Sequence, residues 1–422
     1  MGIVWKSTSR DYMKKIRVAF IKFGGLSAGG TERWLQMMAV NLPRDRFAVD
    51  YYYCDAAPYL GSNYKHANTD PDRMNYLQDN GISLIKFHVG FKDITRSTHA
   101  WVDTDFWEIF DSSAYDLVQT AKAGDKEYPY YLIDLPVVEF VALSSGVDPS
   151  PNIAYSIHPS DWQRSRWIKA GGKLEKSSVI PVPVEKPISI ATLREELHIP
   201  NEAVVAGYHQ RPDNNTASEI PLGAFSKIQK PNWHFIILGG GTLYRHWAKD
   251  LEVKNVHFLE ASADPTRISN FLNTLDIFAH GRKDGETFGT VFAEAMIHGL
   301  PCLSHFTESA NAQEETMNKG GLFAKDFEDY KYKLQNLFED NELRTELGSF
   351  GRAYAEKFYR VEGAVKNLCE VYEKILKNEN FLDHKTREDM VIARKSEIEK
   401  SYWEKLMIKT KKLFFTIWKN KK

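Results

Sequence analysis

The sequence predicts an α/β protein of two Rossmann-like, doubly wound βα domains, and three observations carry this prediction. The chain has 422 residues, which exceeds a single ordinary core and favours two domains. Short β-rich runs alternate with helical segments on both sides of residues 179–187. That stretch, VIPVPVEKP, holds three prolines, which lock φ and disfavour helix, so it indicates a stiff linker between the domains.

The first half opens with an apolar run at 16–23, a glycine-rich turn and a helix. Glycines let backbone N–H groups approach an anion closely, as in phosphate-binding loops; here they are Gly24, Gly25, Gly29 and Gly30. A turn with Thr31 as helix N-cap explains the same residues without a ligand, and both interpretations stay open. Further strands are expected at 48–54, 82–89, 115–121 and 152–158. Residues 91–111 lack clean periodicity and form either a loop facing the cleft or a capping insertion.

After the linker the βα pattern restarts. The expected strands are 204–210, 234–240, 256–260, 275–280 and 302–305, and the expected helices lie near 217–229, 242–250, 265–274, 287–299 and 307–318. Residues 341–377 also have helical spacing of apolar residues. The cleft between the strand carboxyl ends of the two domains is then the expected ligand site.

The segment Asp284 to Pro301, DGETFGTVFAEAMIHGLP, is the most informative stretch of the second half. Its apolar residues follow a 3.6-residue period and predict a helix over 287–299 that ends at a glycine and a proline. Glu286 would stand at the N-terminus of this helix, where backbone N–H groups suit an anionic ligand. Glu294 lies off the apolar stripe and should face water or a cleft. A first-turn dipole partner and a solvated glutamate are the simpler interpretation of the pair.

Composition excludes several classes of protein. The 55 Lys and Arg nearly balance the 56 Asp and Glu, which gives no case for nucleic acid binding. The three cysteines show no metal-ligand spacing, so we expect no metal and a reducing, cytoplasmic environment. No apolar run reaches the ~18 residues of a membrane span, and the N-terminus has no apolar core of signal-peptide length.

The C-terminal stretch differs from the rest. Residues 383–404 alternate acidic and basic residues, as an exposed helix does. Residues 405–422 hold seven lysines and no acid, interleaved with apolar and aromatic residues at helical spacing. This pattern is typical of an amphipathic helix on an anionic membrane surface. An oligomer contact or a disordered tail are the alternatives.

Three sets of residues together resemble the retaining glycosyltransferase family 4, whose fold is GT-B. They are Gly29-Gly30-Thr31-Glu32, Gly239-Gly240-Gly241, and Glu286-Thr287-Phe288-Gly289 through Glu294-Ala295-Met296 with Gly299-Leu300-Pro301. The Glu-x7-Glu helix is the specific part of the resemblance, which spans roughly residues 15 to 375. It implies an acceptor-side domain at 1–180 and a nucleotide-sugar-binding domain at 181–360. A helix at 361–380 would cross back to the first domain, ahead of the basic tail at 381–422.

The resemblance also implies roles for individual residues. Glu294 would bind ribose hydroxyls, and Glu286 would approach the donor sugar, since carboxylates accept hydrogen bonds from hydroxyl groups. Negative charge grows on the leaving diphosphate, and Arg211 with the helix N-terminus would stabilise it without a metal or another cofactor. The remaining expected nucleotide-sugar contacts are Gly29, Gly30, Thr216, Gly240, Phe288 and Gly289.

The chain departs from the family at two points. A lysine usually follows the arginine by five positions, and here that position is Thr216, so one cation of the diphosphate clamp is missing. Lys283, Arg282 or Lys122 could replace it, although a surface charge is the simpler interpretation of each. The catalytic histidine of the first domain has no clear counterpart; His158 is the candidate, and a core or capping histidine is the alternative.

These observations predict a glycosyltransferase of the EC 2.4 class that uses a UDP- or GDP-linked sugar and a glycan or lipid-linked acceptor. It would assemble surface polysaccharide or glycolipid on the inner face of the membrane. A non-catalytic GT-B scaffold is the main alternative. A sugar-nucleotide epimerase is another, and a nicotinamide oxidoreductase with Asp55 as ribose-binding acid is a third.

Overall fold

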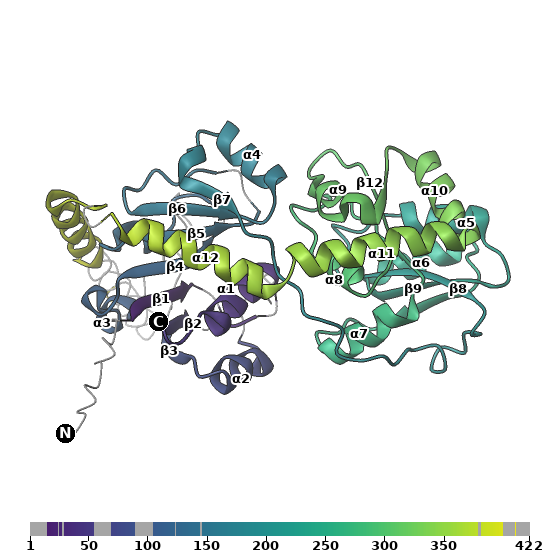
Figure 1. The fold of residues 1–422 in the computed structure, drawn as a ribbon, viewed down its shortest axis with the longest axis horizontal. Coiled ribbons are helices and arrows are strands. Elements are labelled where there is room, and N and C mark those ends of the chain that lie inside the picture. Colours follow the sequence, from purple (N-terminus) through teal and green to yellow (C-terminus); the bar gives the residue numbers. More distant parts are fainter. Residues whose placement is uncertain are drawn as a thin grey trace, which may run out of the picture.

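The computed structural model describes residues 15–23, 25–27, 29–54, 69–88, 104–122, 124–143, 146–378, 381–399 and 410. Within these ranges, two parallel β-sheets lie side by side, each packed against helices (Figure 1). The predicted α/β architecture of two Rossmann-like domains is therefore confirmed.

The first sheet has seven strands in the order β3-β2-β1-β4-β5-β6-β7, and all neighbouring pairs are parallel. The strands are β1 (Ile16–Lys22), β2 (Phe47–Cys54), β3 (Ser83–Phe87), β4 (Leu117–Lys122), β5 (Val137–Val141), β6 (Ile153–His158) and β7 (Ser177–Val179). The α-helices of this part are α1 (Gly30–Asn41), α2 (Pro71–Asp79), α3 (Phe106–Ile109) and α4 (Asp161–Lys169). The order reverses between β1 and β4, which is the switch point where α/β sheets bind ligands.

Helix α1 is held on the first sheet by its apolar face. Trp34, Leu35 and Met38 are completely buried, and the Trp34 ring stacks on Phe140 with ring centroids 4.1 Å apart. Burial of each such side chain contributes roughly 1.5–3 kcal/mol. This packing fixes the position of the helix N-terminus at Gly30. Gly30 lies next to the second domain: a Cβ atom at this position would be 4.0 Å from Thr290 Oγ1.

The second sheet has six parallel strands in the order β10-β9-β8-β11-β12-β13. They are β8 (Val204–Gln210), β9 (Trp233–Gly239), β10 (Val256–Leu259), β11 (Ile277–Ala279), β12 (Cys302–His305) and β13 (Gly321–Ala324). Its helices are α5 (Ile220–Ile228), α6 (Thr242–Asp250), α7 (Pro265–Thr274), α8 (Thr290–Ile297), α9 (Ala312–Met317), α10 (Phe327–Glu339) and α11 (Asn341–Phe358). The switch point lies between β8 and β11.

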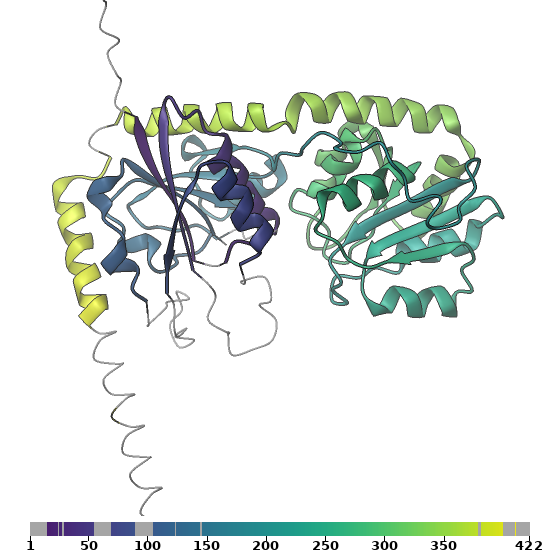
Figure 2. The ribbon, with the colours of Figure 1, turned by 90° about the horizontal axis from the view of Figure 1, so that it is seen from below.

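The helix expected over 341–377 is two helices, α11 and α12 (Val361–Leu376), which together run along both domains (Figure 2). Arg360 between them has extended backbone, with φ −87° and ψ 146°, so the helix cannot continue through it. The Tyr359 carbonyl accepts a hydrogen bond of 2.8 Å from the Val184 amide in the proline-rich linker. The chain therefore crosses between the domains twice at one place.

Helix α12 packs on the first domain. The Tyr372 hydroxyl donates a 2.9 Å hydrogen bond to Gln119 Oε1 in β4, and Glu373 forms an ion pair with Arg46. Residues 384–399 are also helical, and Arg394 in this helix lies 3.2 Å from Asp134 of the first domain. The C-terminal part of the chain thus completes the domain that the N-terminal part begins.

The helix predicted at 287–299 is shorter and begins later, at Thr290. Gly289 has φ +82° and ψ 70°, a left-handed conformation that a right-handed helix cannot include. The spacing predicts Glu286 at the helix N-terminus, and this prediction is wrong, because Glu286 lies four residues before the helix begins. It forms an isolated parallel bridge with Asn311 instead. The buried residues Phe292, Ala295 and Met296 confirm the apolar stripe.

Several expected features lie outside the described residues. They are Gly24, Asp55, most of the segment 91–111, and residues 405–422 apart from Thr410. Among the helices that are described, none has the length and apolar character needed to cross a bilayer.

Candidate functional site

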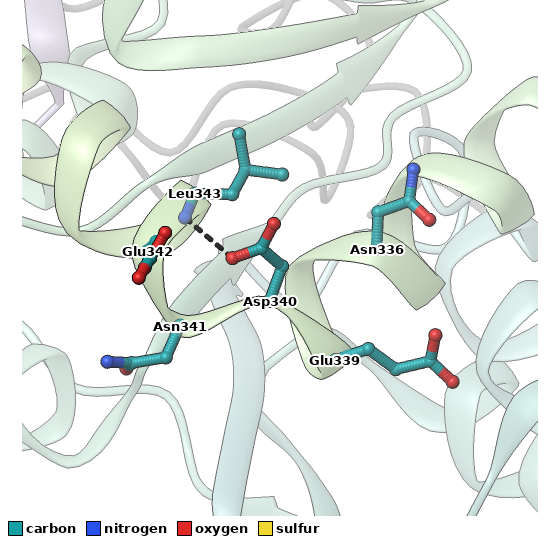
Figure 3. Close-up of a pocket in the computed structure, with 6 residues that line it drawn as sticks. All are labelled: Asn336, Glu339, Asp340, Asn341, Glu342 and Leu343. Carbon is teal, nitrogen blue, oxygen red and sulfur yellow. Dashed lines mark hydrogen bonds between the residues drawn. The ribbon is translucent and has the colours of Figure 1, made fainter.

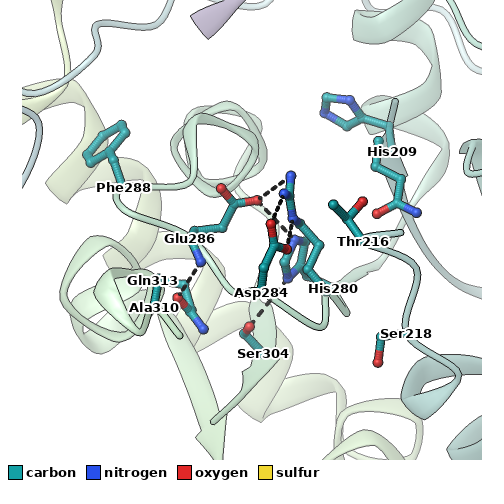
Figure 4. Close-up of polar contacts among 12 residues, drawn as sticks. His209, Thr216, Ser218, His280, Asp284, Glu286, Phe288, Ser304, Ala310 and Gln313 are labelled. Carbon is teal, nitrogen blue, oxygen red and sulfur yellow. Dashed lines mark hydrogen bonds and ion pairs between the residues drawn. The ribbon is translucent and has the colours of Figure 1, made fainter. Parts of the chain in front are cut away.

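The polar residues of interest follow the ends of β8 and β11 in the second domain and β1 in the first. Because these strands flank the two switch points, their carboxyl ends bring together Gln210 to Thr216, His280 to Gly289, and the start of α1. Figure 4 shows contacts of the 280–289 loop, including those of His280 with Ser304 of β12 and of Glu286 with Gln313 of α9. The site is thus made of loops, and the two sheets hold the loops in place.

Glu286 lies at the centre of this group. Its Oε1 atom is 3.5 Å from His280 Nε2 and 3.5 Å from Arg282 Nη1, and its side chain is 19% exposed. The backbone is fixed on both sides, because its N–H donates to Gln313 Oε1 at 3.1 Å and its carbonyl accepts from the Ala312 N–H at 3.0 Å (Figure 4). The carboxylate is therefore held in place and still reaches solvent.

His280 is buried beneath Glu286. Burial lowers its pKa, and the nearby Glu286 carboxylate offsets this only in part, so the imidazole is neutral at pH 7. The Tyr330 hydroxyl donates to the His280 carbonyl at 3.0 Å, and His280 Nδ1 lies 3.4 Å from Ser304 Oγ. The His280 ring thus lies against the Glu286 carboxylate, and burial favours its neutral form.

Arg282 supplies a cation beside Glu286. Its guanidinium makes two hydrogen bonds to Asp284, from Nε at 2.8 Å and from Nη2 at 2.7 Å. Burial would lower its pKa, but the hydrogen bonds to Asp284 and the charge of Glu286 outweigh burial and raise it. Arg282 also forms a backbone bridge with Ala217, the residue after Thr216. Of the three candidates for the missing cation, Arg282 therefore lies beside both Thr216 and Glu286.

Thr216 closes a tight turn. Its hydroxyl donates to the Asp213 carbonyl at 3.2 Å, and its own carbonyl accepts from the Lys283 N–H at 3.1 Å. Arg211 follows β8 directly, has an exposed side chain, and accepts a 2.8 Å hydrogen bond from Asp213 N–H at its carbonyl. This loop thus lies against the loop that carries Arg282.

Lys122 is engaged elsewhere. Its side chain is completely buried, 3.0 Å from Glu139 Oε2 and paired with Asp148, and it donates to the Asp125 carbonyl at 2.8 Å. A buried ammonium between two carboxylates is expensive to separate from them. Lys122 therefore serves the core of the first domain, and the sequence-based suggestion that it reaches the donor across the cleft is wrong for this conformation.

Glu294, on α8, faces the first domain. Its Oε1 lies 3.0 Å from Arg33 Nη1 of α1, and its Oε2 lies 3.3 Å from His209 Nε2. Burial alone would raise the pKa of Glu294, but His209 and the Arg33 charge outweigh burial and lower it to about 2. Glu294 is thus neither a core residue nor a solvated one; it is a carboxylate between the two domains.

Besides the Arg33–Glu294 ion pair, a second set of contacts between the domains involves the loop that contains Glu286. Ser160 Oγ donates to the Thr287 carbonyl at 2.6 Å, and both oxygens of Glu315 accept hydrogen bonds of 2.8 Å from the amides of Asp161 and Trp162. Glu315 thereby caps the N-terminus of α4 from the other domain. The Glu286 loop and the end of β6 are consequently held together.

His158 is the last residue of β6, two positions before Ser160. Its ring is buried against Trp167, with ring centroids 4.9 Å apart, and burial lowers its pKa to about 4. The side chain is 0% exposed, which suits a core histidine. His158 thus lies near the Glu286 loop, because Ser160, two residues later, is hydrogen-bonded to that loop. The His158 imidazole itself is buried.

The backbone groups expected at the donor are also located. Gly29 is the N-cap of α1, and Gly30 faces Thr290 at the start of α8, so the two helix N-termini lie close together. Phe288 is 4% exposed, its ring packs edge-on against Tyr359, and its carbonyl accepts from Thr316 Oγ1 at 2.5 Å. The Phe288 side chain therefore anchors the loop in the core.

Packing alone explains why position 240 is a glycine. Its φ is +87°, and a Cβ would lie 2.8 Å from Ile237 Cγ2. Gly239 has φ +82°, and its Cβ would meet the Gln210 carbonyl at 2.1 Å. These glycines let the β9–α6 turn pass close to the β8–α5 loop, a function that needs no ligand.

His209, His280 and Arg33 were not singled out by the sequence. His209 and His280 lie at or directly after the ends of β8 and β11, where a polar residue that follows a buried strand is a usable signal. Arg33 belongs to a helix of the other domain. Only the placement of the two domains brings it to Glu294.

A separate hollow of about 470 Å³ lies at the turn between α10 and α11 (Figure 3). Its lining residues are Asn336, Glu339, Asp340, Asn341, Glu342 and Leu343. Three carboxylates and no cation among these residues would repel an anionic nucleotide. The hollow is therefore unsuited to the nucleotide sugar that the sequence predicts as ligand.

Comparison with known proteins identifies the second domain. Residues 189–354 match the family model of glycosyl transferases group 1. The chain is 29% identical to spore coat protein SA of Bacillus subtilis (strain 168) over 113 residues, which are 26% of this chain and 30% of that protein. It thus spans about a third of the length of this curated relative.

Solved structures match nearly the whole fold. A glycosyltransferase from Rickettsia africae ESF-5 matches with TM-score 0.64 and 14% identity, covering 86% of this chain and 99% of that one. Anabaena Alr3699/HepE in complex with UDP-glucose matches with TM-score 0.61 and 19% identity, covering 85% and 100%. The fold is therefore GT-B, and residues 189–354 are similar in sequence to the glycosyl transferases group 1 family.

Proposed function

We propose that this protein is a retaining glycosyltransferase that moves a sugar from a nucleotide donor to a glycan or lipid-linked acceptor. The observation that carries the proposal is the placement of two carboxylates on one loop-helix segment where the domains meet. Glu294 is ion-paired across the interface with Arg33, and Glu286 lies beside Arg282. The glycosyltransferase domain and the UDP-glucose complex of a protein with this fold support it.

In this proposal the donor lies along the segment from Glu286 to Glu294. Glu294 accepts hydrogen bonds from the ribose hydroxyls, and Glu286 faces the donor sugar. The diphosphate lies between them, near Gly29, Gly30 and the N-terminus of α8. Helix N-termini favour anions, because their backbone N–H groups and dipole present positive charge.

Transfer breaks the bond between the anomeric carbon and the diphosphate oxygen, and the electron pair stays on that oxygen. The acceptor hydroxyl forms the new bond on the same face of the sugar and gives its proton to the leaving diphosphate. Arg211 and Arg282 stabilise the charge that develops there, so that Arg282 takes the place of the lysine absent at Thr216. This assignment uses protein cations only, and no metal or further cofactor is part of it.

A non-catalytic GT-B protein that only binds nucleotides is the second candidate. One observation favours it: the His158 ring is completely buried. A catalytic role for His158 would need the β6 end to move. Turnover distinguishes the candidates, because the scaffold would bind a nucleotide sugar without consuming it.

Nucleotide screening tests the donor class. We expect UDP, GDP or one of their sugars to raise the free energy of unfolding, by about 2.7 kcal/mol at 100 times its Kd. NADH serves as the comparison ligand in the same thermal-shift measurement. Stabilisation by NADH alone would favour the nicotinamide oxidoreductase and contradict the proposal.

The basic stretch 405–422 supports a membrane-associated acceptor and a location on the inner face of the membrane. Each lysine near an anionic bilayer contributes about 1 kcal/mol, and the stretch holds seven. We expect that removing residues 400–422 abolishes sedimentation with anionic liposomes and keeps turnover on a soluble acceptor. Equal sedimentation of both forms would exclude the membrane role of the tail.

A further inference from the structure

Arg33 is the one group of the first domain that the described contacts place on a donor-facing carboxylate. It is the fourth residue of α1, and its amide makes the first hydrogen bond of the helix, to the Gly29 carbonyl at 2.8 Å. Its side chain is 27% exposed, and Glu294 is 13% exposed. The pair is therefore mostly shielded from solvent, where charge-assisted hydrogen bonds are stronger than at the surface.

The two oxygens of Glu294 are divided between two partners. Arg33 Nη1 donates a hydrogen bond to Oε1 at 3.0 Å, and His209 Nε2 lies 3.3 Å from Oε2. The His209 ring is itself fixed, edge-on, against Phe271 and Phe278, with centroids 5.9 and 6.1 Å away. A carboxylate that is hydrogen-bonded at one oxygen and packed against a fixed ring at the other has restricted freedom to rotate.

This arrangement leaves acceptor capacity free. A carboxylate has about four lone-pair sites; Arg33 uses one on Oε1, and the His209 ring lies against Oε2 and covers at most one there. One site per oxygen then remains, which matches two adjacent hydroxyl groups on a ribose. A fixed carboxylate with one acceptor site on each oxygen is suited to a vicinal diol.

A purely structural role for the pair is the simpler alternative. The domains, however, are already joined by Ser160 with Thr287 and by Glu315 with the start of α4. Those contacts use a hydroxyl, a carbonyl, two amides and a carboxylate other than Glu286 and Glu294. Arg33 is thus not required simply to bridge the domains, although it is aimed at the carboxylate assigned to ribose.

We propose that Arg33 is a positioning residue that completes the ribose site from the first domain. The inference rests on the proposed function, because it requires that Glu294 binds the ribose of a nucleotide. Arg33 fixes the orientation of Glu294 and, together with His209, lowers its pKa, so the diol is recognised only when α1 and α8 are in contact. Nucleoside recognition and the approach of the two domains are thereby coupled.

Discrimination between ribose and deoxyribose tests this role. The full-length protein, Arg33→Met and Arg33→Lys are titrated with UDP and 2′-deoxy-UDP, and with GDP and 2′-deoxy-GDP. We expect wild type to prefer the ribonucleotide by about tenfold, as loss of a hydrogen bond to a charged group implies. Arg33→Met should reduce this ratio to about twofold, and Arg33→Lys should restore part of it. The KM for the donor should rise in Arg33→Met more than kcat falls.

Arg267→Met is the matched control. Arg267 also pairs with a glutamate, Glu196, at 2.5 and 2.6 Å, but on the outer surface of the second domain. The preference of Arg267→Met for the ribonucleotide over the 2′-deoxyribonucleotide should equal that of wild type. An unchanged ratio in Arg33→Met overturns the role of Arg33 and leaves the proposed function intact. Failure of wild type to bind any of the four nucleotides overturns both.

Discussion

Replacing Glu286 with glutamine is expected to lower the kcat of sugar transfer about 10²- to 10³-fold, the size of effect seen when one group that stabilises a transition state is removed. Glutamine keeps the shape of the side chain and one acceptor oxygen but loses the charge. Glu286 lies 3.5 Å from both His280 and Arg282, so its charge is part of a defined electrostatic arrangement. Release of the nucleotide from the donor, with and without acceptor, is the measurement.

Two comparisons make this experiment decisive. Because Glu286 is assigned to the sugar, Glu286→Gln should bind the free nucleoside diphosphate as well as wild type or better, since one negative charge has gone. Glu342→Gln is the control, because Glu342 is exposed on α11. A loss of nucleotide affinity as large as the loss of turnover would move Glu286 away from the sugar and refute the assignment.

Arg211 and Arg282 are the two cations proposed to contact the diphosphate. Each single variant, Arg211→Ala and Arg282→Ala, is expected to lower kcat/KM about 10²- to 10³-fold. Arg282 has a further reason to matter. Without it, Asp284 and Glu286 lose the cation between them and repel both each other and the diphosphate. Steady-state kinetics with the donor identified by thermal shift gives both values, and Arg245→Ala on the exposed face of α6 is the control.

The position of Thr216 allows a gain-of-function arm. Thr216 lies in the turn that contacts the Arg282 loop, since Lys283 N–H donates to its carbonyl. If Arg282 replaces the absent lysine, then Thr216→Lys should restore part of the activity lost in Arg282→Ala. Full activity in Arg282→Ala, or no rescue in the double variant, would show that Arg282 does not take over this role.

Much of the fold followed from local pattern. The apolar runs at 204–210 and 302–305 and the helices at 242–250 and 265–274 were predicted within a residue of their observed bounds. Strand β5 was missed because it contains Glu139, whose charge disguises a buried strand. That glutamate is tolerated only because Lys122 and Ser156 pair with it, a long-range fact that no local window contains.

The candidate site, like the fold, was predictable only where local sequence pattern carries the information. Glu286 and Glu294 stand out by spacing, and Arg211 enters only through the family resemblance. The start of α8 was misplaced because Phe288 fits the helical period of the apolar residues, whereas the left-handed φ of Gly289 keeps Phe288 out of the helix. Arg33 was out of reach, because its relevance comes from a contact with Glu294, 261 residues away in sequence. The place of His209 at the end of β8 could single it out, but its contact with Glu294, 85 residues away, could not be foreseen.

The order in which the chain is synthesised has a consequence for how the first domain is completed. Tyr372 of α12 hydrogen-bonds Gln119 of β4, 253 residues earlier in the sequence. The whole second domain is synthesised between them. At about 5–20 residues per second, a nascent first domain waits roughly 10 to 50 s for its last helix. During that interval the face of α1 that α12 will cover is without its partner, whereas the second domain is one continuous stretch that needs no later segment.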